Sequence, residues 1–501
     1  MATREEIYNR VSFAPDAKLP WWDRIRYCAG SIGTNLPWVA FGYYLMFFYT
    51  NVLGISPIIA GTIMLGARVW DCITDMIMGW AVDHFNLKWG KYRSWVLISL
   101  IPNALLFIGV FTVFPGISDT AKIIWAVITY GNYGAVAATL CYIPMSAQIM
   151  NITKNVEERS TLVGIKMIFA NVGRIIVSAA ILPMAKLFSG ISPNAEVPDA
   201  RVLAPGFFWM AVVLAALVVV LLYGVAAMSK KYELNADGSY REHLRVSKAV
   251  KTDPLLEQIK NVLTNRAAVI LVSGIFIQYI MDAVKSGMIM YVFGDYFKVS
   301  TFIPTLMLVN TGMMVVGAVL LKPTIHVFKD SNRAFCITMA LHLVTTLLFY
   351  VLCLGLGPEN GAVSIRFGLL FFLFGLSGLF MGSHLAYMGV LLPNCVEYGA
   401  WKNKKYQPGM IYSFDAVSLT FGGALGAQLL GILLNWSGYV ANTAQGADTL
   451  KKLLVVAFLI PSVLVGVQLV IQLFFGLTDK QCNEYAVENQ ARLKAEAEQA
   501  K

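Results

Sequence analysis

The sequence is poor in charge and in histidine, and its cysteines follow no recognisable pattern. Only 14% of its 501 residues are charged and 57% are hydrophobic, whereas a soluble domain has about 25% charged and about 45–50% apolar residues. Its seven cysteines lack a Cys-x-x-Cys spacing, and its five histidines form no cluster. These deficits argue against a soluble enzyme, a disulfide framework and a zinc site. We expect His342 and His384 to make local hydrogen bonds only.

Long apolar runs are abundant instead, and the mean hydropathy is +0.64. A membrane-spanning helix needs about 20 predominantly apolar residues. Because lipid offers no partner for an unpaired backbone amide, each run is expected to be helical. The sequence therefore predicts an all-α polytopic membrane protein with twelve transmembrane helices: 27–50, 58–82, 95–115, 121–149, 162–188, 205–228, 267–293, 302–328, 334–356, 364–392, 410–436 and 452–476.

The net charge of +10 is unevenly distributed along the chain. Most of the 39 Lys and Arg residues fall in the two tails and in alternate loops, as the positive-inside rule requires. This pattern predicts a multi-pass protein of the cell (inner, cytoplasmic) membrane with both termini in the cytoplasm, and no nucleic-acid partner. Residues 1–26 are polar and the first apolar run is a full span, so no signal peptide is expected.

The spans fall into two halves of six, separated by a long basic interruption. Spans 4 and 10 both reach a proline, Pro144 and Pro393, before a charged loop. Duplicated six-helix halves are a common transporter plan, with the substrate site near mid-membrane between them. The predicted organisation is a cytoplasmic N-terminal tail, an N-terminal six-helix bundle, a cytoplasmic central loop, a C-terminal six-helix bundle and a cytoplasmic C-terminal tail: 1–26, 27–228, 229–266, 267–476 and 477–501.

An acidic pair in the second span is the main functional signal. Arg68, Asp71 and Asp75 are spaced i, i+3 and i+7, so they share one face of a helix. Each acidic residue at mid-span costs about 2.5–3.5 kcal/mol on insertion scales. Arg68 offsets part of that cost and leaves one net negative charge, which suits a monovalent cation or a proton. A purely structural Arg–Asp bridge is the alternative, although a bridge needs only one Asp.

Other polar residues lie within spans 4 and 5. Thr139 has a neutral oxygen of the kind that hard-cation sites combine with carboxylates, although a membrane threonine often bonds its own backbone. Lys166 lies near the cytoplasmic end of its span and has the alternative of extending to the interface. Arg174 is about 12 Å deeper at the α-helical rise, which favours a role inside the bundle.

Further candidates for substrate contact lie in the second half and among the aromatic residues. Asp282 and Lys285 are spaced i, i+3, which also permits a self-satisfied pair, and Asp415 is a lone carboxylate in span 11. Aromatic rings suit the apolar face of a sugar, and they also form interfacial belts in membrane proteins. The aromatic candidates for sugar contact are Trp38, Tyr142 and Tyr291.

Three segments together resemble a known transporter family. These are Tyr49–Gly54, the span 2 stretch Ala67–Trp80 continuing into Lys88–Trp95, and Leu392–Lys402 followed by Gly409–Ser413. They are similar to signatures of the glycoside–pentoside–hexuronide:cation symporters, the melibiose-permease-like branch of the major facilitator superfamily. The resemblance covers nearly the whole chain.

The resemblance implies a major facilitator fold and a sugar symporter driven by Na⁺, Li⁺ or H⁺ through alternating access. Asp71 and Asp75 match the family's cation carboxylates. Thr74, which replaces the family's usual asparagine, and Thr139 fall where further cation ligands sit, and Arg68 matches an arginine near that site. The implied partners are a small sugar or glycoside, a monovalent cation and the bilayer. We expect a monomer and no cofactor besides the coupling ion.

The expected sugar site departs from the family pattern. Asn35 and Tyr142 align with carboxylates that grip the sugar in melibiose-type members, and residues 420–422 lack the family's lysine. Loss of two acids with retention of Lys166 and Arg174 suits an anionic sugar such as a glucuronide. Asn35 bonds a neutral sugar equally well, so both alternatives stay open.

Two other classes of function are compatible with a polytopic membrane protein. A lipid-carrying branch also resembles this family, so the same fold with a lipid or other non-sugar solute is the alternative. A membrane-embedded enzyme or sensor would need a nucleophile–base constellation, a metal-ligand cluster or an appended soluble domain, and the sequence shows none of these. We therefore expect a transporter and no enzymatic activity.

Overall fold

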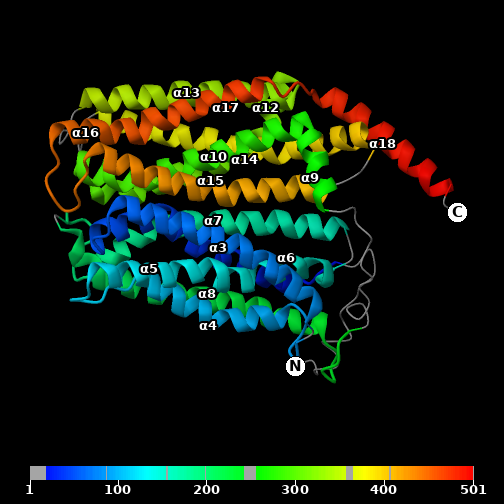
Figure 1. Ribbon diagram of the computed structural model, residues 1–501, viewed down its shortest axis with the longest axis horizontal. Coiled ribbons are helices and arrows are strands. Elements are labelled where there is room, and N and C mark those ends of the chain that lie inside the picture. Colours follow the sequence, from blue (N-terminus) through cyan, green and yellow to red (C-terminus); the bar gives the residue numbers. More distant parts are fainter. Residues whose placement is uncertain are drawn as a thin grey trace. The chain divides into compact units, whose positions relative to one another are not determined.

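The chain is almost wholly helical in the computed structural model, which describes residues 18–85, 87–153, 156–197, 199–241, 255–356, 365–404 and 408–499 (Figure 1). Within these residues the only β-type pairing is an isolated bridge between Leu234 and Tyr240. The expected all-α fold is confirmed. The chain divides into two compact units, Met1–Val250 and Lys251–Lys501.

The first unit is a helical bundle in which the second expected span meets the fourth. α3 packs against α5, η3 and α6, while α2 packs against α7 and α8, and α4 packs against α8. Its described elements are α2 (Trp21–Ala40), η1 (Phe41–Leu45), η2 (Phe48–Val52), α3 (Pro57–His84), α4 (Arg93–Val110), α5 (Asp119–Asn132), η3 (Tyr133–Ala138), α6 (Thr139–Ile152), α7 (Val156–Phe188), η4 (Ala200–Leu203) and α8 (Ala204–Glu233).

The second unit is also a bundle, with α10 near its centre. α10 packs against α14, α15 and α17, while α14 also packs against α11 and α13. Its described elements are α9 (Leu255–Thr264), α10 (Arg266–Met290), η6 (Tyr291–Tyr296), η7 (Ser300–Phe302), α11 (Ile303–Val319), α12 (Leu321–Phe328), α13 (Ser331–Leu356), α14 (Ile365–Asn403), α15 (Pro408–Ser437), α16 (Ala447–Leu454), η8 (Val455–Leu459), α17 (Ile460–Leu473) and α18 (Asp479–Gln499).

Several long helices contain π-helical segments at related places in the two units. η1 and η2 follow α2 at the end of the first expected span, and η6 follows α10 at the end of the seventh. η3 interrupts the fourth span between α5 and α6. A π-helical turn takes up an extra residue and is frequent at functional sites. Spans 1 and 7, the first of each expected half, thus both end in π-helical segments.

Ten helices in the described part of the chain are long and apolar enough to cross a membrane. The two expected spans outside this set, 27–50 and 58–82, are helical too, as α2 with η1 and η2 and as α3. Both carry polar residues within the span, Asn35 in the first and the acidic pair in the second, and these polar residues lower the mean hydropathy of the two helices. A polytopic helical membrane protein is confirmed.

Candidate cation and substrate site

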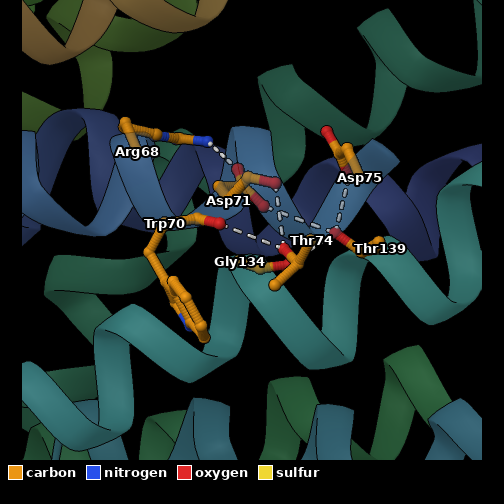
Figure 2. A network of polar contacts seen from close by, with 7 residues as sticks. All are labelled: Arg68, Trp70, Asp71, Thr74, Asp75, Gly134 and Thr139. Atoms are coloured by element: carbon orange, nitrogen blue, oxygen red, sulfur yellow. Dashed lines mark hydrogen bonds and ion pairs between the residues drawn. The ribbon is translucent and has the colours of Figure 1, made fainter. Parts of the chain in front are cut away.

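The acidic pair lies on α3, whose start is well defined by its sequence. Ser56 caps this helix by accepting a hydrogen bond from the Ile59 amide, and Pro57 occupies its first turn. Arg68 Nη1 lies 3.2 Å from Asp71 Oδ2, so the expected i, i+3 pair forms (Figure 2). The Asp71 side chain is buried, whereas Asp75 is exposed. The two carboxylates and one guanidinium leave one net negative charge.

Thr139 lies at the start of α6 and contacts both carboxylates of α3 (Figure 2). Its Oγ1 lies 2.7 Å from Asp75 Oδ1 and 3.4 Å from Asp71 Oδ1. It also lies 3.0 Å from the carbonyl oxygen of Gly134 in η3. A hydroxyl has one hydrogen and two lone pairs, so it donates to one of these oxygens at a time. The result is a group of closely spaced oxygens between α3 and the fourth span.

Gly134 belongs to this group, and sequence reasoning did not single it out. A Cβ atom built at this position would lie 3.2–3.3 Å from the Asp71 carboxylate atoms, which is tighter than an ordinary van der Waals contact. Glycine thus lets the backbone of η3 approach the buried acid. The available signal was the group of small residues Gly134, Ala135, Ala137 and Ala138, because small residues permit close approach of membrane helices.

Thr74 is oriented differently from Thr139. Its Oγ1 donates to the backbone carbonyl of Asp71 at 2.9 Å and lies 3.3 Å from that of Trp70. Both acceptors belong to its own helix, so the Thr74 hydroxyl satisfies the backbone of α3 (Figure 2). Of the two threonines predicted as cation ligands, only Thr139 contacts both carboxylates in this structure.

Trp38 connects α2 to the arginine of the acidic pair. The Arg68 Cζ atom lies 3.8 Å from the centroid of the Trp38 ring, within cation–π distance. The same indole contacts the Tyr133 ring edge-on at a centroid distance of 5.9 Å. Trp38 was predicted to touch sugar, and its observed contacts place it beside the cation-site arginine.

A second polar group lies between α2, α6 and α7. Asn35 Nδ2 donates to the Ser31 carbonyl at 2.8 Å, and Ser31 Oγ donates to the Lys166 carbonyl at 2.9 Å. The Lys166 ammonium nitrogen lies 5.8 Å from the centroid of the Tyr142 ring, which is 56% exposed. Three of the predicted substrate residues thus gather in one region of the first unit. Arg174 lies on the same helix as Lys166, about two turns further along.

The predicted substrate residues of the second unit are dispersed. Tyr291 is buried and contacts Tyr439 edge-on at a centroid distance of 5.0 Å. Lys285 is buried on α10, one turn after Asp282, and its ammonium donates to Ser377 Oγ at 2.5 Å. Asp415 lies partly buried on α15. Among the described residues these side chains form no single group.

The oxygens around Thr139 suit a hard cation, which prefers carboxylate, hydroxyl and carbonyl ligands. A softer metal would prefer imidazole and thiolate ligands. In the described part of the chain no group of three or more His, Cys, Asp or Glu residues is placed to hold a metal ion.

Known proteins resemble this chain over most of its length. The family described as MFS/sugar transport protein matches residues 26–479. The isoprimeverose transporter of Lactiplantibacillus pentosus is 29% identical over 459 residues, which cover 91% of this chain and 89% of the relative. A glucuronide carrier protein homolog of Escherichia coli (strain K12) is 24% identical, with 96% and 97% of the two chains covered.

Solved structures support the same fold. A D-xylose-proton symporter is similar with a TM-score of 0.60 at 13% identity, over 91% of this chain and 97% of that one. At this identity the likeness shows the fold alone, and it confirms the expected major facilitator architecture. The family match confirms the resemblance inferred from the sequence motifs and makes the chain a membrane transporter, not an enzyme. The chain belongs to the MFS/sugar transport protein family.

Proposed function

We propose that this transporter carries a sugar or glycoside together with a monovalent cation, Na⁺ or H⁺, by alternating access. The observation that carries the proposal is the Thr139 hydroxyl between two intramembrane carboxylates, 2.7 Å from Asp75 and 3.4 Å from Asp71. Placing two acids within an apolar span is costly. A bound cation offsets the free-energy cost of the two intramembrane acids, so cation binding at this site can be coupled to transport.

The proposed cation ligands are Asp71, Asp75, Thr139 and the Gly134 carbonyl. Arg68 neutralises one carboxylate at 3.2 Å, so one negative charge remains for one monovalent cation. A divalent cation would leave an uncompensated positive charge in a low-dielectric region. We leave Thr74 out of the proposed ligand set because its hydroxyl bonds the backbone of its own helix.

The proposed sugar site is the group formed by Asn35, Tyr142 and Lys166, extended by Arg174 along α7. Tyr142 offers an exposed ring for the apolar face of a sugar, and Asn35 offers an amide for its hydroxyls. Lys166 and Arg174 add positive charge. Asn35 and Tyr142 are uncharged at the two positions that align with the sugar-binding carboxylates of melibiose-type members. This balance favours an anionic glycoside, and the name of the glucuronide carrier relative supports that class.

The experiment is substrate uptake by proteoliposomes with an imposed Na⁺, Li⁺ or H⁺ gradient. Panels of neutral glycosides and glucuronides identify the substrate class. We expect uptake above equilibrium only with the coupling cation's gradient, and loss of that accumulation in Asp75→Asn. The matched control is Asp119→Asn, which removes an exposed carboxylate paired with Lys122. Accumulation of sugar without any cation gradient would refute the coupling.

The proposed setting is a monomer in the cell membrane with both termini in the cytoplasm. The alternation of basic loops supports this orientation. The test is the reaction of a single cysteine, introduced at Ser118 or at Lys402 in a variant without the seven native cysteines, with a membrane-impermeant reagent in whole cells. Ser118 immediately precedes α5, and Lys402 lies in the last turn of α14. The proposed topology requires labelling at Ser118 and protection at Lys402.

A lipid or other apolar solute is the second candidate, and one feature favours it. A groove of about 540 Å³ lies between α3 and α5, with a lining that is mostly apolar and includes Ile63, Trp70, Val127 and Ile128. An acyl chain fits such a surface. Transfer of a labelled lipid between vesicles, with no accumulation of any glycoside, would establish this candidate in place of the sugar.

A further inference from the structure

The second unit contains a buried polar chain that the proposed cation and sugar sites do not use. Lys285 on α10 donates to Ser377 Oγ on α14 at 2.5 Å. The same oxygen lies 3.0 Å from His342 Nε2 on α13. The three side chains are 7%, 3% and 0% exposed. Residues from three helices thus form one line of hydrogen bonds between two basic nitrogens.

The surroundings of this chain are mainly apolar. The Lys285 nitrogen lies 5.6 Å from the Phe374 ring centroid, and the His342 ring centroid lies 6.0 Å from that of Phe380. In the described part of the chain His342 Nδ1 has no hydrogen-bond partner. A buried and incompletely satisfied imidazole is costly, which calls for a role beyond packing.

His384 brings a second imidazole to the same place. Its ring centroid lies 5.1 Å from that of His342, and both residues are fully buried. The expectation that His342 makes only local hydrogen bonds is wrong, because its Nε2 contacts Ser377 on another helix. His342 and His384 are 42 positions apart in the numbering and on different helices, so no local sequence pattern could bring them together.

Asp282 and His384 are the titratable groups nearest to this chain on α10 and α14, and Asp282 lies one turn before Lys285. α11 and α17, which pack against the same helices, contain no Asp, Glu, Lys, Arg or His. On α10, η6, α13 and α14 the other charged residues lie two or more helical turns along the helix from Lys285, His342 or Ser377: Arg266, Asp295, Arg333, Arg366, Glu397 and Lys402. Asp415 is the charged residue of α15, which packs against α10. Charged or titratable residues also occur on α9, α12, α16 and α18, which pack against α10, α13 or α14.

The hydroxyl of Ser377 allows one proton to occupy either end of the chain. With Lys285 protonated, the ammonium donates to Ser377, which donates its own hydrogen to neutral His342 Nε2. In the reverse state the imidazolium donates to Ser377, which donates to the neutral amine. Transfer breaks an Nζ–H bond and the old Oγ–H bond, and it forms a new Oγ–H bond and an Nε2–H bond. One proton moves, charge is conserved and no other reactant is needed.

The doubly protonated state is disfavoured for two reasons. Two positive charges joined through one oxygen repel each other strongly where the effective dielectric constant is low. Burial of a second uncompensated charge adds a desolvation cost. The chain therefore accommodates one positive charge more readily than two.

We propose that Lys285, Ser377 and His342 form a buried binding site for one exchangeable proton in the second unit, separate from the acidic pair of the first. This site makes the protein respond to pH whichever cation the acidic pair binds. The proposal does not depend on the identity of the transported solute.

The test is a histidine titration by NMR on the full-length protein in nanodiscs, with isotope-labelled histidine. The chain has only five histidines, and His342→Gln assigns the His342 signal. Lys285→Met removes the competitor for the proton, so we expect the His342 titration midpoint to rise by about one pH unit or more, a tenfold gain in proton affinity. Lys285→Arg keeps a permanent charge, so we expect its His342 titration midpoint to stay below that of Lys285→Met.

The controls are internal to the same spectra. His326 is exposed on α12, and its midpoint should be unchanged in every variant. If Lys285→Met does not fold, Ser377→Ala carries the test, because it should remove the hydrogen-bond shift of the His342 Nε2 signal. Equal His342 midpoints in the wild type and Lys285→Met, or an unaltered Nε2 signal in Ser377→Ala, would overturn the proposal.

Discussion

The Thr139 hydroxyl lies 2.7 Å from the Asp75 carboxylate, although 64 positions separate the two residues. The contact joins the second expected span to the fourth, at the point where η3 gives way to α6. A hydroxyl that bridges two acids can either donate a hydrogen bond or turn a lone pair toward a cation. The Thr139 hydroxyl can therefore serve the site both with and without a bound cation.

Thr139→Val is expected to weaken cation activation of transport by about tenfold. It removes one oxygen ligand and leaves two carboxylates unbridged, a loss of about 1–2 kcal/mol. Thr139→Ser keeps the oxygen and should remain within about twofold of the wild type. The measurement is the Na⁺ or H⁺ concentration for half-maximal uptake in proteoliposomes. Equal behaviour of the two variants would show that the hydroxyl has no part in cation binding.

Gly134→Ala is expected to displace the Asp71 carboxylate and lower cation affinity by about tenfold or more. The added Cβ meets carboxylate atoms at 3.2–3.3 Å, and overpacking of this kind costs about 1–3 kcal/mol. Gly131→Ala is the matched control, because nothing lies within 4 Å of a Cβ atom there. Cation-dependent thermal stabilisation of both variants gives the comparison. A similar loss in the control would mean that helix propensity, not proximity to Asp71, is responsible.

Lys166→Met is expected to separate anionic from neutral substrates. The Lys166 ammonium lies beside the exposed Tyr142 ring, so its loss should reduce glucuronide uptake by at least tenfold and change uptake of a neutral glycoside by less than threefold. Competition between the two sugars in the same vesicles provides the measurement. Lys122→Met, at an exposed surface ion pair, serves as control. Parallel loss of both sugars would contradict a charge-reading role.

Glu233→Gln is expected to lower thermal stability without altering cation affinity. The buried Glu233 carboxylate accepts hydrogen bonds from the Tyr92 and Arg93 amides at 3.1 Å and from Gln148 Nε2 at 2.8 Å. It therefore caps the start of α4, and each charge-assisted bond contributes about 1.5–3 kcal/mol. We expect a drop of several degrees in the melting temperature. An unchanged melting temperature would show that the neutral amide caps the helix equally well.

The site illustrates which contacts can be read from local sequence. The Arg68–Asp71 pair was predictable because both residues lie on one helix at a spacing that brings side chains together. The orientation of Thr74 toward its own backbone was not predictable, since a threonine on a helix has more than one hydrogen-bonding rotamer. Gly134 was missed because its importance lies in what approaches it from another helix.

The sequence by itself determined the membrane architecture and the acidic pair. Apolar runs of span length must be helical because lipid leaves the backbone no other partner, and helical periodicity places Arg68, Asp71 and Asp75 on one face. Tertiary structure alone decided that Thr139 bridges the two carboxylates and that Ser377 connects Lys285 to His342. Such contacts depend on how closely distant helices pack and on the rotamers that this packing permits, and neither is encoded in a local pattern.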